Sequence, residues 1–134
     1  MDFLAYISTP KNTPEIPGQV LKLHLTRGRL TGGFLYFPSG SAGTLHFVAR
    51  LGGTQILPFS TDQSYRLDDC VIPFSLGIDL LEPPFSIDCV TWNDSNNHAH
   101  ALSVCFFVSP AAKKRSIIQV IKNPFSGTEG YQKS

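Results

Sequence analysis

The chain has 134 residues, of which 42% are hydrophobic and only 16% are charged, and it contains 11 glycines and 10 prolines. This length is typical of a single domain that buries its own core, so neither a multidomain protein nor a disulfide-dependent scaffold is expected. A surface with so few charges indicates that part of it is covered by another surface.

The net charge of +1 conceals an uneven distribution. Residues 113–134 carry five basic residues and one acidic residue, a net +4, whereas residues 1–112 carry six basic and nine acidic residues, a net −3. A basic tail on a mildly acidic body fits contact with a neighbouring copy or with an acidic partner. Nucleic acid is not the expected partner, because the basic residues of the body are scattered and partly offset by acids.

The N-terminus and the cysteines indicate where the chain is made. Residues 1–7 contain an acid and no basic residue, so no signal peptide is expected, and no run approaches the roughly 20 apolar residues of a membrane span. Cys70, Cys89 and Cys105 are odd in number and lack metal-type spacing, which predicts three free thiols of structural character. We therefore expect synthesis in the reducing cytoplasm.

Strand-like segments bounded by turn residues recur along the whole chain, and no segment shows apolar residues at helical spacing. The expected strands are residues 3–8, 20–25, 30–37, 44–51, 54–57, 70–74, 76–81, 85–92 and 99–108. The proline-rich residues 9–19 form an extended connector. Gly32-Gly33 marks a bulge or a close backbone approach, and Pro73 places its strand near a sheet edge.

Two hairpins are expected from these segments. Residues 44–51 alternate apolar and polar positions and reverse at Gly52-Gly53 into residues 54–57. Residues 85–108 contain two alternating runs separated by a polar tip, which predicts a second hairpin that closes the body. If the apolar faces of that hairpin are matched, Cys89 and Cys105 point to opposite faces, so no disulfide joins them.

About eight short strands predict an all-β fold: a single antiparallel β-sandwich or jelly-roll with extended N- and C-terminal arms. We divide the chain into an N-terminal strand and proline-rich arm (1–19), a β-sandwich body (20–110) and a basic C-terminal arm (111–134). The β-branched residues 116–121 must pair either within their own sheet or with the edge of a partner, and the sequence leaves both options open.

Arms at both ends suggest exchange of strands between subunits. The residues expected at subunit interfaces are Phe3, Leu4, Tyr6, Ile117, Ile118, Val120, Ile121 and Phe125.

No catalytic constellation is recognisable, since no serine lies in a nucleophile elbow and the paired glycines lack the lysine of a phosphate loop. Asp68-Asp69 is interpreted as a solvated turn, and His46 as an exposed or hydrogen-bonded side chain. His98 and His100 share one strand face, but two imidazoles do not complete a zinc site. We therefore expect no enzymatic activity, no cofactor and no metal.

The polar segment that follows Trp92 is a candidate ligand site, because sugars are held by a flat aromatic face together with planar amides and carboxylates. Its ordinary interpretation is a long turn that satisfies its own backbone, with Trp92 plugging the core. The residues assigned to this possible site are Trp92, Asn93, Asp94, Asn96, Asn97, His98 and His100.

Residues 30–38, 52–58 and 92–110 together resemble, in architecture and turn placement, the small β-sandwich virion proteins of phages, of the decoration, capsid-lattice or tail-adaptor type. The resemblance implies a non-enzymatic structural protein that forms homo-oligomers, contacts other virion proteins and enters a virion after cytoplasmic synthesis. It carries over no functional residue. The alternative function is a carbohydrate- or receptor-binding module that uses the 92–100 tip to bind a glycan.

Overall fold

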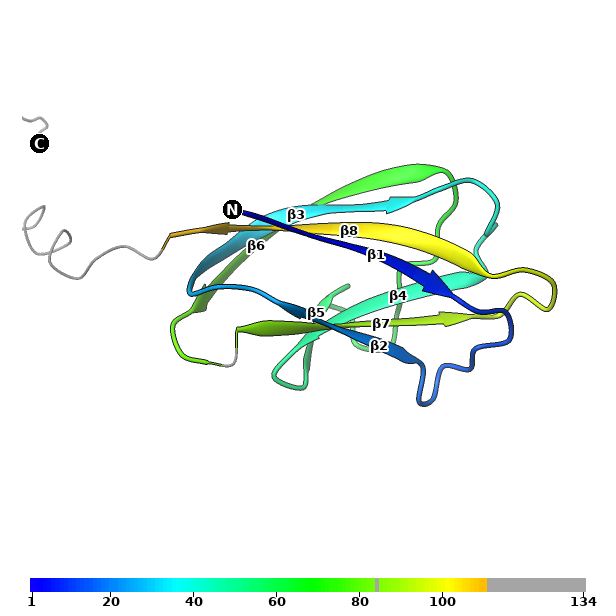
Figure 1. Cartoon of the computed structure of the whole chain (residues 1–134), viewed down its shortest axis with the longest axis horizontal. Helices are drawn as coiled ribbons and strands as arrows, with labels where there is room; N and C mark the ends of the chain where they lie inside the picture. Colours follow the sequence, from blue (N-terminus) through cyan, green and yellow to red (C-terminus); the bar gives the residue numbers. More distant parts are fainter. Residues whose placement is uncertain (84, 111–134) are drawn as a thin grey trace, which may run out of the picture.

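The computed structural model describes residues 1–83 and 85–110, which form two four-stranded antiparallel sheets packed as a β-sandwich (Figure 1). The strands are β1 (Asp2–Thr9), β2 (Gln19–His24), β3 (Gly28–Phe37), β4 (Leu45–Leu51), β5 (Thr54–Leu57), β6 (Cys70–Leu80), β7 (Ser86–Asn93) and β8 (His100–Ser109). The predicted all-β sandwich is therefore confirmed. Within the described residues no helix is long and apolar enough to cross a membrane.

The first sheet has the strand order β1-β8-β3-β6, and the second sheet has the order β2-β7-β4-β5. Only β4 and β5 are neighbours both along the chain and within a sheet, so every other connection crosses from one sheet to the other. Eight strands divided in this order form a jelly roll. Of the two architectures that the sequence left open, the strand order selects the jelly roll.

The predicted hairpin at residues 85–108 is wrong. β7 pairs with β2 and β4 in the second sheet, whereas β8 pairs with β1 and β3 in the first sheet, so the segment between them crosses the sandwich. Alternation within each run identified two strands, but it carries no information about which strand pairs with which. The other predicted hairpin is confirmed, because β4 pairs with β5 across Gly52-Gly53.

The core lies between the inner faces of the two sheets. Its largest fully buried side chains are Phe37 and Phe106 from the first sheet and Phe47 from the second. All three cysteines are free, as predicted. Burial, helped by the nearby Asp88 carboxylate, raises the pKa of the Cys89 thiol to about 12, so this side chain behaves as a small apolar core residue.

The irregularity predicted in β3 is present. The register of β3 with both of its neighbours shifts between Leu30 and Gly32. A Cβ atom at Gly33 would collide with the carbonyl oxygen of Cys105, so the close approach of β8 requires glycine there. Pro73 lies in β6, an edge strand, as expected, although residues 70–80 form one continuous strand rather than two.

The N-terminal residues belong to the sandwich. β1 pairs with β8 along its whole length, and the terminal ammonium group donates a hydrogen bond to the Val108 carbonyl oxygen at 2.8 Å. Of the residues assigned to the N-terminal arm, only Met1 and residues 10–18 lie outside the strands. The predicted C-terminal arm and its strand at 116–121 lie outside the described residues.

Candidate functional site

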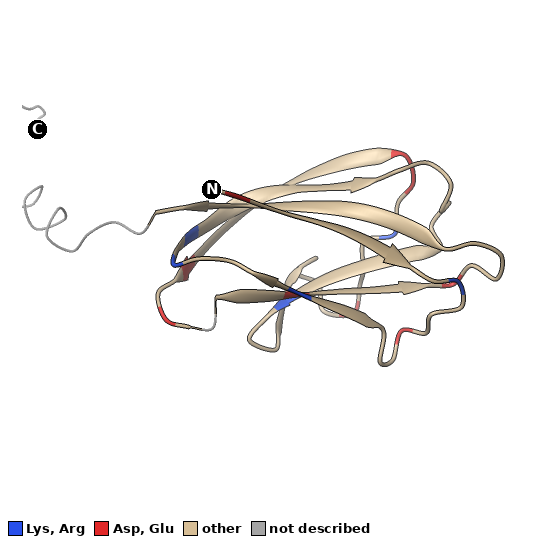
Figure 2. Ribbon diagram, viewed as in Figure 1, with Lys and Arg blue, Asp and Glu red and all other residues tan. Residues whose placement is uncertain are grey.

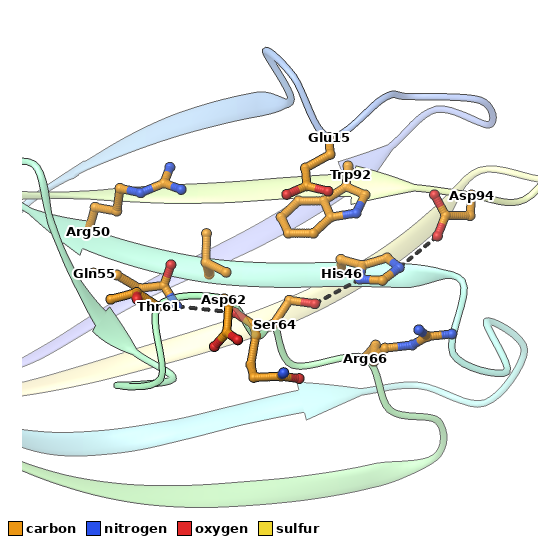
Figure 3. Close-up of a pocket in the computed structure, with 12 residues that line it drawn as sticks. Glu15, His46, Arg50, Gln55, Thr61, Asp62, Ser64, Arg66, Trp92 and Asp94 are labelled. Atoms are coloured by element: carbon orange, nitrogen blue, oxygen red, sulfur yellow. Dashed lines mark hydrogen bonds and ion pairs between the residues drawn. The ribbon is translucent and has the colours of Figure 1, made fainter.

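A pocket of about 340 Å³ opens on the outer face of the second sheet (Figure 3). Its floor consists of the outward side chains of β4 and β7, namely His46, Val48 and Trp92. The loop at residues 58–66 borders one side, and Glu15 of the proline-rich connector borders the other. The pocket therefore combines the connector, β4 with the loop that follows β5, and β7, three parts of the chain that are far apart in the sequence.

Gln55 holds the loop over the sheet. Its side-chain amide nitrogen lies 2.8 Å from the carbonyl oxygen of Pro58 and 3.1 Å from those of Ser60 and Gln63. The amide has only two protons, so three acceptors share them, and the side chain is 7% exposed. One β5 residue thus satisfies three loop carbonyls that would otherwise need water.

The end of the loop is attached to β4 by its backbone. Phe47 and Tyr65 exchange two backbone hydrogen bonds, of 2.9 and 3.0 Å, which form an isolated antiparallel bridge. This bridge places the preceding residue, Ser64, beside the outward side chain of His46.

His46 is the centre of the pocket. The residue is only 6% exposed, and its ring stacks on Trp92 with a centroid separation of 4.7 Å and an interplanar angle of 11°. Its Nδ1 lies 2.8 Å from Ser64 Oγ, and its Nε2 lies 2.7 Å from Asp94 Oδ2. Because a carboxylate only accepts hydrogen bonds, we assign the proton of neutral His46 to Nε2, and Nδ1 then accepts from Ser64. This assignment leaves the Ser64 oxygen free to accept a hydrogen bond from a ligand.

Charged side chains of both signs surround this polar centre. The pocket is lined by three carboxylates and two guanidinium groups: Glu15, Asp62, Asp94, Arg50 and Arg66. Across residues 1–83 and 85–110, only Asp94 of these five takes part in an ion pair, and its partner is His46. The other four carry two negative and two positive charges, which cancel, and of these Arg66 donates through Nε to the carbonyl oxygen of Gly43 at 3.2 Å.

The residues assigned from the sequence to the possible ligand site are divided by the fold. Trp92 and Asp94 line the pocket, whereas Asn93 is fully buried. The Asn93 amide donates to the carbonyl oxygens of Thr9 and His98, at 3.2 and 3.0 Å, so it fastens the crossing segment to β1. Asn93 is therefore a structural residue.

The remaining members of that set lie away from the pocket. Asn96, Asn97 and His98 are exposed in the crossing segment, and His100 begins β8. The rings of His98 and His100 are 6.4 Å apart and edge-on. Within the described part of the chain, no group of three or more metal-ligating side chains comes together.

Part of the outer face of the first sheet has a different chemistry, and we call this part the apolar face; the exposed ion pair of Arg29 and Asp79 lies beyond it. Three rows of cross-strand neighbours run over its four strands: Tyr6-Ser103-Tyr36-Val71, Leu4-Cys105-Phe34-Pro73 and Asp2-Phe107-Gly32-Ser75. Asp2, at one corner, is the only charged residue among these twelve. Figure 2 shows the same contrast, because the middle of the first sheet is free of charged residues whereas the middle of the second sheet carries charges of both signs.

Large apolar side chains on this face are exposed to water. Tyr6 is 72% exposed, Leu4 66% and Val71 57%, and the rings of Phe34 and Phe107 meet edge-on at 6.2 Å. Four strands about 4.8 Å apart and three rows about 7 Å apart give the face a flat area of roughly 400 Å². A patch of that size lies within the roughly 300–600 Å² of the largest apolar patch on a typical monomeric protein, and such patches are often functional.

Of the residues expected at subunit interfaces, Leu4 and Tyr6 lie on the apolar face. Phe3 points to the opposite side of β1 and packs against the core. The other five residues of that set lie outside the described residues: Ile117, Ile118, Val120, Ile121 and Phe125.

Sequence reasoning assigned Trp92 and Asp94 to a possible ligand site but did not join them to His46 and Ser64, because the three residues at the centre of the pocket, His46, Ser64 and Asp94, are far apart in the chain. Ser64 and Asp94 lie 18 and 48 residues from His46, so no local motif joins them. The one available signal was alternation, which placed His46 on the outward face of its strand.

Comparisons of the chain with models of protein families, with curated proteins and with solved structures found no significant match.

Proposed function

We propose that this protein is a non-enzymatic structural subunit that self-associates through its apolar face, as a component of a virion or a similar assembly. The observation that carries the proposal is the row arrangement on the first sheet, where Leu4, Tyr6 and Val71 are exposed beside other apolar side chains. Exposed apolar area of this kind favours association, because burying it removes it from water.

A second copy of the chain is the partner that this face fits best. Two copies related by a two-fold axis would bring together the two uncharged rows, those of Leu4 and Tyr6, so no unpaired charge is buried at the centre. Asp2 lies at a corner of the patch and stays in water in such a pair. A partner with a charged surface would lose hydration without gaining a counter-charge.

The size of the face indicates a weak contact. Two copies would bury roughly 800 Å² in total, which is below the roughly 1,200–2,000 Å² of a stable specific complex. Weak contacts suit a subunit that is held by several neighbours at once, since linked contacts reinforce one another. The jelly roll occurs in capsid proteins and also in lectins, so the proposal rests on the face and not on the fold.

Replacement of Tyr6 or Leu4 with glutamate tests the proposal. Either Tyr6→Glu or Leu4→Glu introduces a charge into the patch and should abolish self-association of the full chain. Sedimentation velocity over a range of concentrations should show the average mass of the native protein rising with concentration while both variants stay monomeric. Circular dichroism and thermal melting verify that each variant is folded.

The matched control is Val20→Glu. Val20 is 55% exposed and lies on β2. β2 is an edge strand of the second sheet, just as β1, which carries Leu4 and Tyr6, is an edge strand of the first sheet. This variant should associate like the native chain. The proposal fails if the native chain is monomeric at every concentration, or if Val20→Glu reduces association as strongly as Tyr6→Glu does.

A further inference from the structure

We infer that the pocket over His46 binds a neutral saccharide unit. The inference is independent of self-association, because the pocket and the apolar face lie on the outer sides of different sheets. The pocket volume of about 340 Å³ lies at the lower end of the roughly 300–1,000 Å³ typical of small-molecule sites.

The chemistry of the lining matches that of sugar hydroxyls. Each hydroxyl both donates and accepts hydrogen bonds, and the pocket offers groups of both kinds. Glu15, Asp62 and Asp94 accept, the two guanidinium groups donate, and the Ser64 oxygen is left free to accept by the His46 assignment. Three negative and two positive charges nearly cancel, so the site favours a neutral polyhydroxylated ligand over a strongly charged one.

The site is preorganised. His46 is fixed by hydrogen bonds on both ring nitrogens and by stacking on Trp92. The loop that carries Ser64 and Asp62 is fixed by Gln55 and by the backbone bridge to β4. A ligand therefore meets polar groups that are already ordered, which lowers the entropy cost of binding.

A hydrogen-bonded series of serine, histidine and aspartate side chains also occurs in hydrolases. Two features of the series Ser64-His46-Asp94 oppose catalysis. In the serine-protease triad the aspartate is buried and bonds to Nδ1, while the serine bonds to Nε2. In this protein the serine, Ser64, bonds to Nδ1 of His46 and the aspartate, Asp94, bonds to Nε2. In addition, the Asp94 side chain is 58% exposed. Water screens such a carboxylate, so it stabilises a charged imidazole only weakly. We interpret Ser64 as a binding hydroxyl.

The test is an NMR titration of the full, uniformly ¹⁵N-labelled chain with the methyl glycosides of glucose, galactose, mannose and N-acetylglucosamine. At least one glycoside should cause saturable shifts at amides that surround the pocket. Ser64→Ala and Asp94→Asn should each weaken that binding about tenfold, as expected for losing one hydrogen bond to a polar or charged group. The dispersion of each spectrum shows whether the variant is folded.

Asn96→Ala is the matched control, since Asn96 is exposed in the crossing segment and does not line the pocket. This variant should bind like the native chain, and so should Tyr6→Glu, which separates the present inference from self-association. The inference is overturned if no glycoside shifts the pocket amides, or if Asn96→Ala removes binding while Ser64→Ala does not. Hydrolysis of p-nitrophenyl acetate that disappears in Ser64→Ala would also overturn it, in favour of catalysis.

Discussion

The two sheets bury similar inner faces but present opposite outer faces. The first sheet exposes an apolar patch built from Leu4, Tyr6 and their cross-strand neighbours, with Asp2 at one corner. The second sheet carries the stacked pair of His46 and Trp92 beneath a loop, together with several charged groups. The inner faces must satisfy one shared core, whereas each outer face is free to differ. In this jelly roll the functional information therefore lies on the outer faces.

The largest expected effect comes from a substitution that damages both sheets together. Phe106 is fully buried and packs against Phe74, with ring centroids 5.5 Å apart. Phe106→Ala should lower the free energy of unfolding by about 3–5 kcal/mol through lost burial and the resulting cavity. Urea denaturation measures the loss.

The neighbouring residue provides the control for that substitution. Phe107 points outward and is 38% exposed, so Phe107→Ala should cost clearly less. Equal losses at the two positions would contradict the assignment of inner and outer sides in β8.

A smaller effect, confined to the second sheet, is expected for Gln55→Ala. The substitution leaves three loop carbonyls without their shared donor and should cost about 1–3 kcal/mol. Self-association through the first sheet should be unchanged, whereas the NMR signals of His46 should shift as the loop loosens. Thr54→Ala, at an exposed position on the same strand, should leave both stability and spectrum close to native.

The exposed ion pairs should contribute less still. Lys22 Nζ and Asp88 Oδ1 are 2.8 Å apart, with side chains 55% and 35% exposed. Lys22→Ala should cost at most about 1 kcal/mol, because water and salt screen the pair. The melting temperatures of the native chain and of Lys22→Ala should differ in low salt and converge in high salt. A difference in melting temperature that does not depend on salt would show that Lys22 acts through packing instead.

The smallest effect is a pH dependence at the turn after β3. Hydrogen bonds from the backbone N–H groups of Ala42 and Gly40 lower the pKa of Asp68 below its ordinary value of 3.8. Because the folded pKa is depressed, this contribution to stability is present above pH 3.8 and is lost as the pH falls through the folded value. Asp68→Asn should remove this part of the loss of stability at low pH. Acid titrations of the native chain and of the variant, monitored by circular dichroism, test this expectation.

Much of the local structure could be predicted from the sequence. Alternation located the strands and their buried sides, Gly32-Gly33 located the bulge in β3, and Pro73 located an edge strand. The reason is physical: side chains alternate with period two along a strand, and the backbone limits of glycine and proline act on their immediate neighbours. These constraints are local, so a short stretch of sequence is enough to reveal them.

The partners of the strands, and with them the candidate site, were decided only by the tertiary structure. The two runs at 85–108 have the composition of a hairpin, yet they enter different sheets because each one pairs with strands that are distant in the sequence. That crossing, together with the bridge between Phe47 and Tyr65, brings Ser64 and Asp94 to His46. Pairing depends on packing over the whole chain, which the local alternation of side chains does not encode.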